Sequence, residues 1–520
     1  MRIIIISLLL SFVVKSDSFK ILCIFPYNGR SHHIFYSSLV EELANKGHDV
    51  TVINYHPLKK LPNLRQIFLE NEENVSDNRN IEDYMKGMSN DLLRAYDNAQ
   101  SLKYLAYTNC RKLISNPEVQ EMIKYRKFYD VAVVEQFMTD CGLAIAYKLD
   151  APTVGITAHT LMPWTYSRLG APNNAAYVHN HYFGSGTTPN ILNRLKSAFI
   201  NFSMNIFYKY FIQATDQEMV NELYPDVPSL EEIGKNMSLI MLNQYFPLTG
   251  PRLHGPNVIE IGGMQINEDA QIIDKDLRKF LDTSDTEVVY LSFGTVATNF
   301  PPNVIDEIKS LIAKCKLRFI WKTDISDWSP PGNAFLRKWM PQVSVLCHPK
   351  VMAFITHSGM LSTSEAIHCG VPVVSVPLFG DQFANGFFAV ENGLGVTVDL
   401  TMFNSDALEN ALSKILQDKF QKRAKLLSQL WRDRPLSAMN TAIYWIEYVA
   451  KHKTDVNIKP PTVDLPFYEF FTLDPVFIFS SIIVLFLIAY SIVKIISLVR
   501  TLFCVTFIYF HRRICKNKKE

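Results

Sequence analysis

The feature that most constrains the fold is an alternation of β-rich and helical segments in the first half of the chain. Residues 20–25 and 49–54 are β-rich, and the amphipathic segment 34–46 between them predicts a helix. The alternation continues with β-rich residues 131–134 and 153–156. Strands that alternate with helices in this way form a parallel sheet with helices on both faces. We therefore expect an α/β domain in this half.

The same alternation restarts after residues 247–263, which are rich in proline and glycine. The second set has helical patterns at 303–314 and 359–369 and β-rich residues at 288–293, 318–321, 351–356 and 371–376. Two such sets predict two facing, doubly wound, Rossmann-like domains, which we place at residues 19–270 and 271–455. Ligands bind such sheets outside the carboxyl ends of the strands, so the loops after residues 25, 134, 293 and 356 are candidate sites.

Two apolar segments at the ends of the chain indicate a secretory or membrane-anchored protein. Residues 3–14 are apolar, follow Arg2 and precede small polar residues, which predicts a signal peptide at 1–18; the alternative is a buried first strand. Residues 476–493 carry no charge and are long enough to cross a bilayer as one helix. Residues 456–475 would then be a juxtamembrane linker.

Charge predicts the orientation of this single span. The chain holds 52 Lys and Arg against 50 Asp and Glu, but the tail at 494–520 has seven basic residues and one acidic one. The positive-inside rule places this tail in the cytosol and the body in the lumen, a type I topology. Lys516 and Lys518 resemble a dilysine retrieval signal of the endoplasmic reticulum membrane, although plain topology charge explains them as well. The balanced charge of the remainder excludes a nucleic-acid binder.

The sequons and cysteines indicate which covalent modifications to expect in the lumenal body. Asn74, Asn201 and Asn236 each begin an Asn-x-Ser triplet in the predicted lumenal body, which indicates a glycoprotein. The eight cysteines include no CxxC pair and no zinc-ligand spacing. We therefore expect neither a disulfide scaffold nor a structural metal site.

The strongest chemical signal is the segment THSGMLSTSEAIHCGVPVVSVPLFGDQ, which follows the strand expected to end at residue 356. His357 would reach the sheet edge, and Gly359 would open a helix whose free N–H groups can cradle a phosphate. Glu365, about two turns along that helix, could accept both hydroxyls of a ribose. Asp381 and Gln382 offer acceptors and a donor to vicinal sugar hydroxyls.

Trp339 and Gln342 lie shortly before this segment and supply a flat aromatic face and an amide. Such groups suit the stacking and edge recognition of a pyrimidine base. Any one of these residues alone is more often structural. Together and in this order they indicate a nucleotide-sugar site.

This stretch, residues 339–382, closely resembles the signature of the UDP-glycosyltransferases, including the spacing from Glu365 to Asp381. The resemblance covers the whole predicted lumenal body, the signal peptide and the anchor, as in the membrane-bound animal members. The SFGT at 292–295 and the VEQF at 134–137 are more similar to the insect UDP-glucosyltransferase branch. The resemblance implies a glycosyltransferase fold of the B type, with the acceptor bound mainly by the first domain and the UDP-sugar by the second. It also implies inversion at the anomeric centre, with no metal and no cofactor besides the UDP-sugar.

The resemblance further assigns donor-binding roles to residues of this chain. Trp339 would stack on uracil, Gln342 would bond its edge or the ribose, and Glu365 would hold the ribose. Asp381 and Gln382 would fix the transferred sugar. The groups that would face the diphosphate are Ser292, Gly294, Thr295, His357, Gly359 and Ser362.

Two positions depart from the family pattern. The family often has glycine where this chain has Ser358, and the vertebrate branch often has asparagine where Leu361 stands. The first change would reshape the phosphate loop. The second removes a polar contact to the nucleotide, for which Ser362 is the substitute.

On the acceptor side, His32 matches the family's catalytic histidine. An inverting transfer needs a base that takes the proton of the acceptor hydroxyl, and an imidazole is suited to this near neutral pH. A carboxylate should orient and stabilise the imidazolium. Glu135 and Asp140 are both candidates for this partner, depending on whether a one-residue gap is allowed, and Asp140 could instead be a helix N-cap.

The sequence thus favours a transferase of the endoplasmic reticulum membrane. It would move a hexose from UDP to a hydroxyl of a small lipophilic acceptor, as in detoxification. We favour UDP-glucose over UDP-glucuronic acid as the donor. A non-catalytic protein that binds lipophiles or nucleotide sugars on the same fold is the alternative, and a transferase acting on lipid or protein is a further one. Whether identical chains assemble is left open.

Overall fold

The computed structural model describes residues 18–70, 91–178, 180–182, 190–267, 274–294, 300–453 and 458–517. The chain divides at residue 463 into two compact units, and we call the first of them the body. The predicted signal peptide at 1–18 lies outside the described residues, Ser18 excepted.

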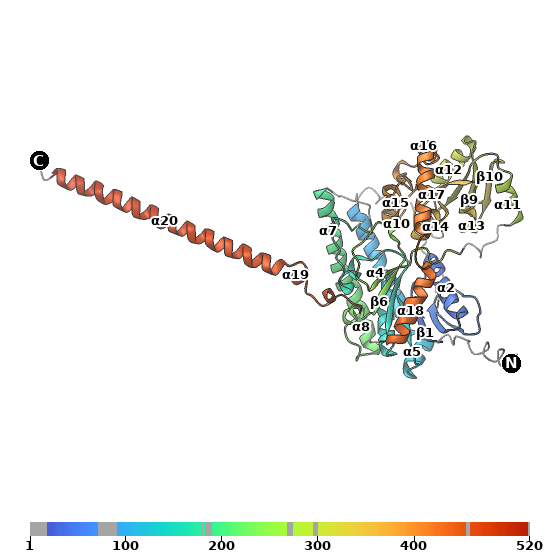
Figure 1. Ribbon diagram of the computed structural model, residues 1–520, viewed down its shortest axis with the longest axis horizontal. Coiled ribbons are helices and arrows are strands. Elements are labelled where there is room, and N and C mark those ends of the chain that lie inside the picture. Colours follow the sequence, from blue (N-terminus) through green and yellow to red (C-terminus); the bar gives the residue numbers. More distant parts are fainter. Residues whose placement is uncertain are drawn as a thin grey trace, which may run out of the picture. The chain divides into compact units, whose positions relative to one another are not determined.

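The first lobe of the body is built on a seven-stranded parallel sheet in the order β3-β2-β1-β4-β5-β6-β7 (Figure 1). Every residue of β4 and β5 is buried, as is usual for strands covered on both faces. The strands are β1 (Lys20–Ile24), β2 (Asp49–Asn54), β3 (Leu64–Phe68), β4 (Val131–Glu135), β5 (Thr153–Thr157), β6 (Leu239–Leu242) and β7 (Val258–Glu260).

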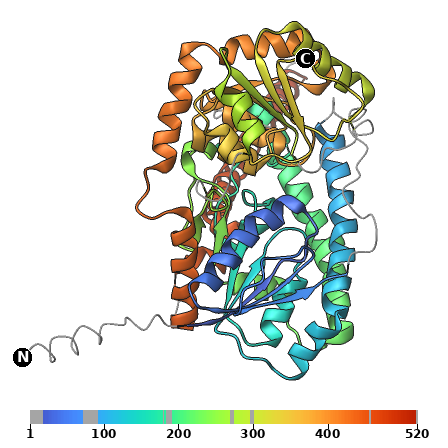
Figure 2. The same ribbon diagram turned by 90° about the vertical axis from the view of Figure 1, so that its right-hand side faces the viewer.

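The second lobe contains a six-stranded parallel sheet in the order β10-β9-β8-β11-β12-β13. Figure 2 shows this lobe above the first one. Its strands are β8 (Val288–Ser292), β9 (Arg318–Lys322), β10 (Ala334–Arg337), β11 (Val351–Thr356), β12 (Val373–Ser375) and β13 (Gly395–Thr397). Two parallel α/β sheets were predicted, and this prediction is confirmed.

Helices cover both faces of each sheet because their apolar residues recur on one side. In α2 (Arg30–Asn45), for example, Phe35, Tyr36, Leu39 and Leu43 are buried in the core. The other helices of the first lobe are α4 (Asp91–Ser115), α5 (Pro117–Lys124), α6 (Cys141–Lys148), α7 (Ile191–Phe207), α8 (Ala214–Leu223) and α9 (Leu230–Lys235). Those of the second lobe are α11 (Lys275–Asp282), α12 (Pro302–Lys314), α13 (Gln342–Leu346), α14 (Met360–Cys369), α15 (Gln382–Glu391), α16 (Ser405–Ile415) and α17 (Asp418–Arg432).

The helix α18 (Ala438–His452) lies in the range that we assigned to the second domain, yet it packs on the first sheet. Its residues Ala442, Ile443, Ile446 and Val449 belong to the same buried cluster as α2 and β1. Figures 1 and 2 both show α18 running along the first lobe. The first lobe is therefore made of an N-terminal stretch and a returning C-terminal helix.

The segments that cross between the lobes meet around Arg434. The short helix α10 (Phe246–Thr249) follows β6 of the first sheet and packs on α15 and α17 of the second lobe. The Arg434 guanidinium lies 3.8 Å above the ring of Tyr245 and 5.0 Å from that of Trp431, and it donates to the Gly262 carbonyl oxygen at 3.1 Å. One side chain thus joins three of the crossing segments.

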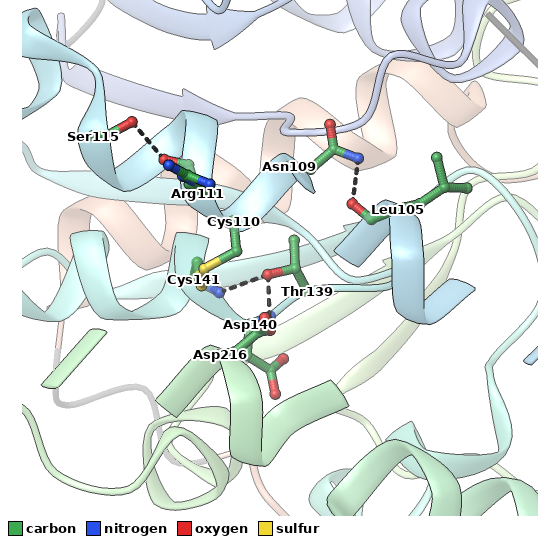
Figure 3. The surroundings of a disulfide bond; sticks show 9 residues. All are labelled: Leu105, Asn109, Cys110, Arg111, Ser115, Thr139, Asp140, Cys141 and Asp216. Atoms are coloured by element: carbon green, nitrogen blue, oxygen red, sulfur yellow. Dashed lines mark hydrogen bonds between the residues drawn. A yellow bond between two sulfur atoms is a disulfide. The ribbon is translucent and has the colours of Figure 1, made fainter. Parts of the chain in front are cut away.

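Two disulfides correct the expectation that the cysteines form no disulfide scaffold. Cys110 of α4 is bonded to Cys141 at the start of α6, and Cys347 is bonded to Cys369 at the end of α14. The paired residues are separated by 31 and 22 positions, so no local spacing pattern marks them. Figure 3 shows the first disulfide beside the buried Asp216; because both thiols are used in the bond, this cluster offers no thiolate to a metal ion.

The second unit contains α19 (Phe467–Phe470) and the long helix α20 (Leu473–Asn517). Among the described residues, α20 is the one helix long and apolar enough to cross a membrane. It includes the predicted span at 476–493 but continues for 45 residues in all, well beyond the ~20 that a bilayer requires. Most of the predicted cytosolic tail at 494–520 is therefore helical.

Candidate active site

A cavity of about 520 Å³ lies between the two lobes and is lined by both. In each sheet it faces the point where the strand order reverses, between β1 and β4 in the first and between β8 and β11 in the second. Loops at the carboxyl ends of parallel strands diverge there, which leaves room for a ligand. The cavity is therefore the place where the fold itself predicts a site.

His32 and Glu135 meet at the first-lobe edge of this cavity. His32 lies in the first turn of α2, and Glu135 is the last residue of β4. The His32 Nδ1 and the Glu135 Oε1 are 2.6 Å apart, and the Tyr36 hydroxyl donates to the same oxygen at 3.1 Å. An ionised Glu135 can only accept hydrogen bonds; the His32 Nδ1 then donates to it, and Nε2 is the ring nitrogen left for a ligand.

Asp140, the other candidate partner of His32, is held elsewhere. Its two oxygens accept from the Arg168 guanidinium at 2.9 and 2.6 Å, and the Gln213 amide also donates to it. Asp140 is the residue before α6, but its side chain caps no N–H group there. Its backbone N–H donates to the carboxylate of Asp216, which lies beside it in Figure 3.

His357 lies between two glycines in the second lobe. A Cβ atom placed on Gly294 or on Gly359 would come within 2.6 Å of its ring. Burial and the nearby Lys322 lower the pKa of His357 to about 3, so the ring is neutral. Its buried Nδ1 has no hydrogen-bond partner among the described residues. The glycines, which follow β8 and β11, therefore leave a neutral imidazole available to a ligand.

Ser358 has a left-handed backbone, with φ at 61°. A non-glycine residue pays a steric penalty in this conformation, which accounts physically for the glycine that the family pattern often has here. The Ser358 Oγ lies 2.5 Å from the Ser375 Oγ, which holds the serine in this conformation.

Gln342, Ser362 and Glu365 form one hydrogen-bonded group on the same wall of the cavity. The Gln342 Nε2 donates to the Ser362 Oγ at 3.1 Å and to the Glu365 Oε2 at 2.7 Å. Burial raises the pKa of Glu365 to about 7, although the Gln342 amide and Lys322 favour the charged form. The sequence predicted that these residues act together, and the structure brings them into contact.

Replacing Glu365 by glutamine should change how stability depends on pH. A carboxyl group whose pKa rises from 4.5 to about 7 on folding contributes stability that is complete below pH 4.5 and is lost as the pH rises through 7. Glutamine cannot ionise, so the melting temperature of the ligand-free variant, measured relative to the wild type, should increase between about pH 5 and about pH 8. A difference in melting temperature that is the same at both pH values would contradict this.

The other predicted donor-binding residues occupy different positions. Trp339 is 63% exposed at the cavity rim, and Asp381 lines the cavity while accepting from the Asn385 amide at 2.9 Å. The Gln382 oxygen accepts from two backbone N–H groups, so only its amino group is available to a sugar. Ser292 is fully buried and fixes the turn through the Gly294 N–H; Thr295 lies outside the described residues.

Comparison with known proteins decides the family. The sequence model of the family described as "UDP-glucoronosyl and UDP-glucosyl transferase" matches residues 20–507, almost the whole chain. The chain belongs to this family. As a member of it, the chain transfers a sugar from a UDP-sugar to an acceptor.

Relatives from insects and mammals cover the chain nearly end to end. UDP-glucosyltransferase 2 of Dactylopius coccus is 31% identical over 483 residues, which are 91% of this chain and 92% of the relative. UDP-glucuronosyltransferase 1A7 of Mus musculus is 27% identical, over 87% of each chain.

The solved structures agree on the fold, which is the glycosyltransferase B type. A UDP-glucosyltransferase from Polygonum tinctorium, solved with 3,4-dichloroaniline, superposes with a TM-score of 0.55 at 16% identity, over 84% of this chain and 99% of that one.

The cavity of this UDP-glycosyltransferase also contains a row of rings that we did not predict from the sequence. The His159 ring lies 5.8 Å from His32 and 5.3 Å from His181, which is 5.3 Å from Tyr182. Burial and the neighbouring histidines lower the pKa of His159 to about 3, and burial lowers that of His181 to about 4. His159 follows β5 by two residues. Because ligands bind outside the carboxyl ends of parallel strands, the sequence could have predicted this residue.

Lys322 was missed as well, although it ends β9 beside the predicted phosphate loop. Its Nζ donates to the Gly294 carbonyl oxygen at 3.2 Å, and it lines the cavity. Burial lowers the pKa of Lys322, partly offset by the charge of Glu365. A cation at this position would face a diphosphate bound on the helix α14.

The three predicted glycosylation sites differ in accessibility. Asn236 is exposed, and Asn74 lies outside the described residues. Asn201 is 7% exposed, its side-chain oxygen accepts from Asn180, and its amino group donates to Asn173. A buried, hydrogen-bonded amide is a poor position for a surface glycan, so Asn236 is the more accessible of the two described sequons.

Proposed function

We propose that this UDP-glycosyltransferase moves a hexose, glucose, from UDP to a hydroxyl of a small lipophilic acceptor, with inversion and without a metal. The observation that supports this most directly is the 2.6 Å contact of His32 with Glu135 at the edge of the cavity between the lobes. Such a pair is a general base held in one tautomer by a carboxylate.

In the proposed mechanism His32 activates the acceptor. The Nε2 atom takes the proton of the acceptor hydroxyl while that oxygen attacks the anomeric carbon from the face opposite UDP. Glu135 stabilises the imidazolium that forms. The proton stays on His32 until the product leaves, and the bond from the anomeric carbon to the UDP oxygen breaks in the same step.

The second lobe would stabilise the leaving UDP with protein groups alone. Gly359 precedes α14, so the free N–H groups of that helix face the cavity, and Lys322 adds a positive charge beside them. His357 is neutral and lines the same part of the cavity, so it adds no charge there. These groups can neutralise the developing charge on the diphosphate, which supports a metal-independent reaction.

The lining of the acceptor end favours a lipophilic, aromatic molecule. Leu102, Phe137 and Met162 line the cavity there together with Tyr182. The Tyr182 hydroxyl is buried and has no hydrogen-bond partner among the described residues. A polar group of the acceptor would satisfy it.

The preference for glucose rests on similarity. The relative at 31% identity is described as a glucosyltransferase, and the murine relative at 27% as a glucuronosyltransferase.

The proposed location is the endoplasmic reticulum membrane, with the body in the lumen. Both disulfides lie in the body, and disulfides persist in oxidising compartments. The exposed Asn236 is available for N-glycosylation there. Conjugation of lipophilic compounds at this membrane would serve detoxification.

The test is UDP release by membranes that contain the full chain. UDP-glucose and UDP-glucuronic acid are each offered with phenols and aliphatic alcohols, with and without EDTA, beside the variant His32→Ala. We expect acceptor-dependent release with UDP-glucose that EDTA does not change and that falls by about 10²- to 10⁴-fold in the variant. A β-linked product from the α-linked donor would demonstrate inversion.

UDP binding without release for any pair of donor and acceptor would favour the alternative, a non-catalytic binding protein. Release with UDP-glucuronic acid alone would overturn the choice of donor but not the transferase.

A further inference from the structure

The helix α4 of the first lobe contacts the second lobe near its N-terminal end. Arg94 lies in the first turn of α4, and its guanidinium carbon is 4.1 Å from the centroid of the Phe383 ring in α15. A guanidinium within about 6 Å of the face of an aromatic ring is attracted by it. In Figure 2 α4 runs from the first lobe up to the second. Arg94 and Phe383 therefore join one helix of each lobe.

The same side of α4 borders the cavity. Asn98 and Leu102 follow Arg94 at intervals of four residues, so the three side chains lie on one side of the helix. Asn98 and Leu102 both line the cavity. The Asn98 amide also donates to the Arg94 carbonyl oxygen at 2.7 Å. The contact with Phe383 thus lies at the end of the α4 face that forms the cavity wall.

On the second lobe, Phe383 directly follows Asp381 and Gln382, the predicted ligands of the transferred sugar. The Asn385 amide donates to the Asp381 carboxylate at 2.9 Å. The backbone N–H of Leu378 donates to the Gln382 side-chain oxygen at 2.8 Å. These bonds fix both side chains relative to the start of α15. The position of this helix end therefore determines where the two groups would meet a sugar.

The Arg94 guanidinium is partly withdrawn from water. Burial lowers the pKa of Arg94, and the charge of Asp399 partly offsets this effect. Asp399 belongs to the second lobe, where it accepts from the Thr401 N–H at 2.8 Å. A cation–π contact is stronger when the cation has lost part of its hydration. Both the ring and the carboxylate of the second lobe therefore attract Arg94.

This contact lies at a different place from the cluster around Arg434. Arg434 stacks on Tyr245 and Trp431 in the segments that cross between the lobes. Phe383 instead adjoins Gln382, which lines the cavity. A misplacement of a substrate-positioning group by about 1 Å can lower a rate by about 10²-fold. A small shift at the start of α15 would therefore be felt at the sugar.

We propose that Arg94 is a positioning residue for the transferred sugar. By holding Phe383, it keeps Asp381 and Gln382 of the second lobe in the position that binds the hexose of the UDP-sugar. Arg94 acts through Phe383 and not by contact with the sugar. UDP has no hexose, so the affinity for UDP does not depend on Arg94. This inference rests on the proposed role of Asp381 and Gln382 as sugar ligands.

The test compares the affinities of the detergent-solubilised full chain for UDP-glucose and for UDP, measured by calorimetry without an acceptor. The variants are Arg94→Gln, Arg94→Lys, Phe383→Leu and the double variant Arg94→Gln with Phe383→Leu. Arg111→Gln is the matched control, because Arg111 is an exposed arginine of the same helix.

We expect Arg94→Gln to weaken the binding of UDP-glucose by about threefold to tenfold and to leave the affinity for UDP unchanged. Arg94→Lys keeps a cation over the ring and should retain most of the affinity. Phe383→Leu should cause the same loss as Arg94→Gln, and the double variant no further loss, since both changes remove one contact. Arg111→Gln should behave like the wild type.

An unchanged affinity of Arg94→Gln for UDP-glucose would overturn the proposal. An equal loss of affinity for UDP would also overturn it, because Arg94 would then support the second lobe as a whole. The variant Gln382→Ala tests the sugar site separately and should weaken the binding of UDP-glucose but not of UDP. If it does so while Arg94→Gln binds normally, only the role of Arg94 is wrong. If it has no effect, the sugar site is wrong as well.

Discussion

Transfer by the variant Glu135→Gln is expected to fall by about 10³- to 10⁴-fold, with little change in melting temperature. Glutamine has the shape of glutamate, and its side-chain oxygen can still accept from the His32 Nδ1 and from Tyr36. Only the negative charge that stabilises the imidazolium is lost. The measurement is kcat for UDP release at saturating acceptor, together with the affinity for UDP, which should not change.

A matched control separates the charge from the hydrogen bonds around it. Tyr36→Phe removes the second hydrogen bond to the Glu135 Oε1 at 3.1 Å and leaves the carboxylate in place. We expect its kcat to decrease by less than about tenfold. If Glu135→Gln retained wild-type kcat, Glu135 would not be the partner of the base.

The variant Asp140→Asn is expected to show the reverse pattern, a loss of stability of about 3–5 kcal/mol with kcat per folded molecule largely retained. Asp140 and Arg168 are 2% and 1% exposed, and their contact at 2.6 Å is shielded from water. Burial alone would lower the pKa of Arg168, but the charges of Asp140 and Glu231 hold it well above its usual value. Removing the Asp140 charge leaves a buried guanidinium without its main partner.

Glu231→Gln is the control for this variant. Glu231 accepts from the Nε of the same arginine at 2.9 Å, but its side chain is 37% exposed, so water can replace the contact. We expect a loss of less than about 1 kcal/mol. Thermal unfolding of the detergent-solubilised full chain measures both variants. An Asp140→Asn protein that melts like the wild type but has lost its kcat would restore Asp140 as a catalytic candidate.

The sequence predicted the residues whose position follows from the parallel sheets. His357 and Gly359 follow β11, and Glu365 lies on the helix that begins there, so their spacing alone brings them to the cavity. The same rule applied to β5 and β9 would have found His159 and Lys322. Those strands were predicted, but the residues after them belonged to no recognised motif.

Other features could not be predicted because they depend on distant parts of the chain. The contact of His32 with Glu135 rather than Asp140 depends on Arg168, which is 28 residues beyond Asp140 and binds its carboxylate. The disulfides join helices whose contacts only the folded chain establishes. The short strands β7 and β13 have three residues each, too few for a periodic pattern.

The cluster around Arg434 has a mechanical consequence. Three segments that pass between the lobes carry Tyr245, Trp431 and Gly262. The Arg434 guanidinium contacts all three residues, by stacking on the two rings and by a hydrogen bond to the Gly262 carbonyl oxygen. We expect contacts of this kind to act as a pivot, which opposes sliding of one lobe past the other and allows a small rotation. In the proposed mechanism the second lobe holds the UDP-sugar and the first lobe holds the acceptor. Both would then enter and leave the cavity by a hinge-like opening, and the two halves of the site would return to the same relative position after each turnover.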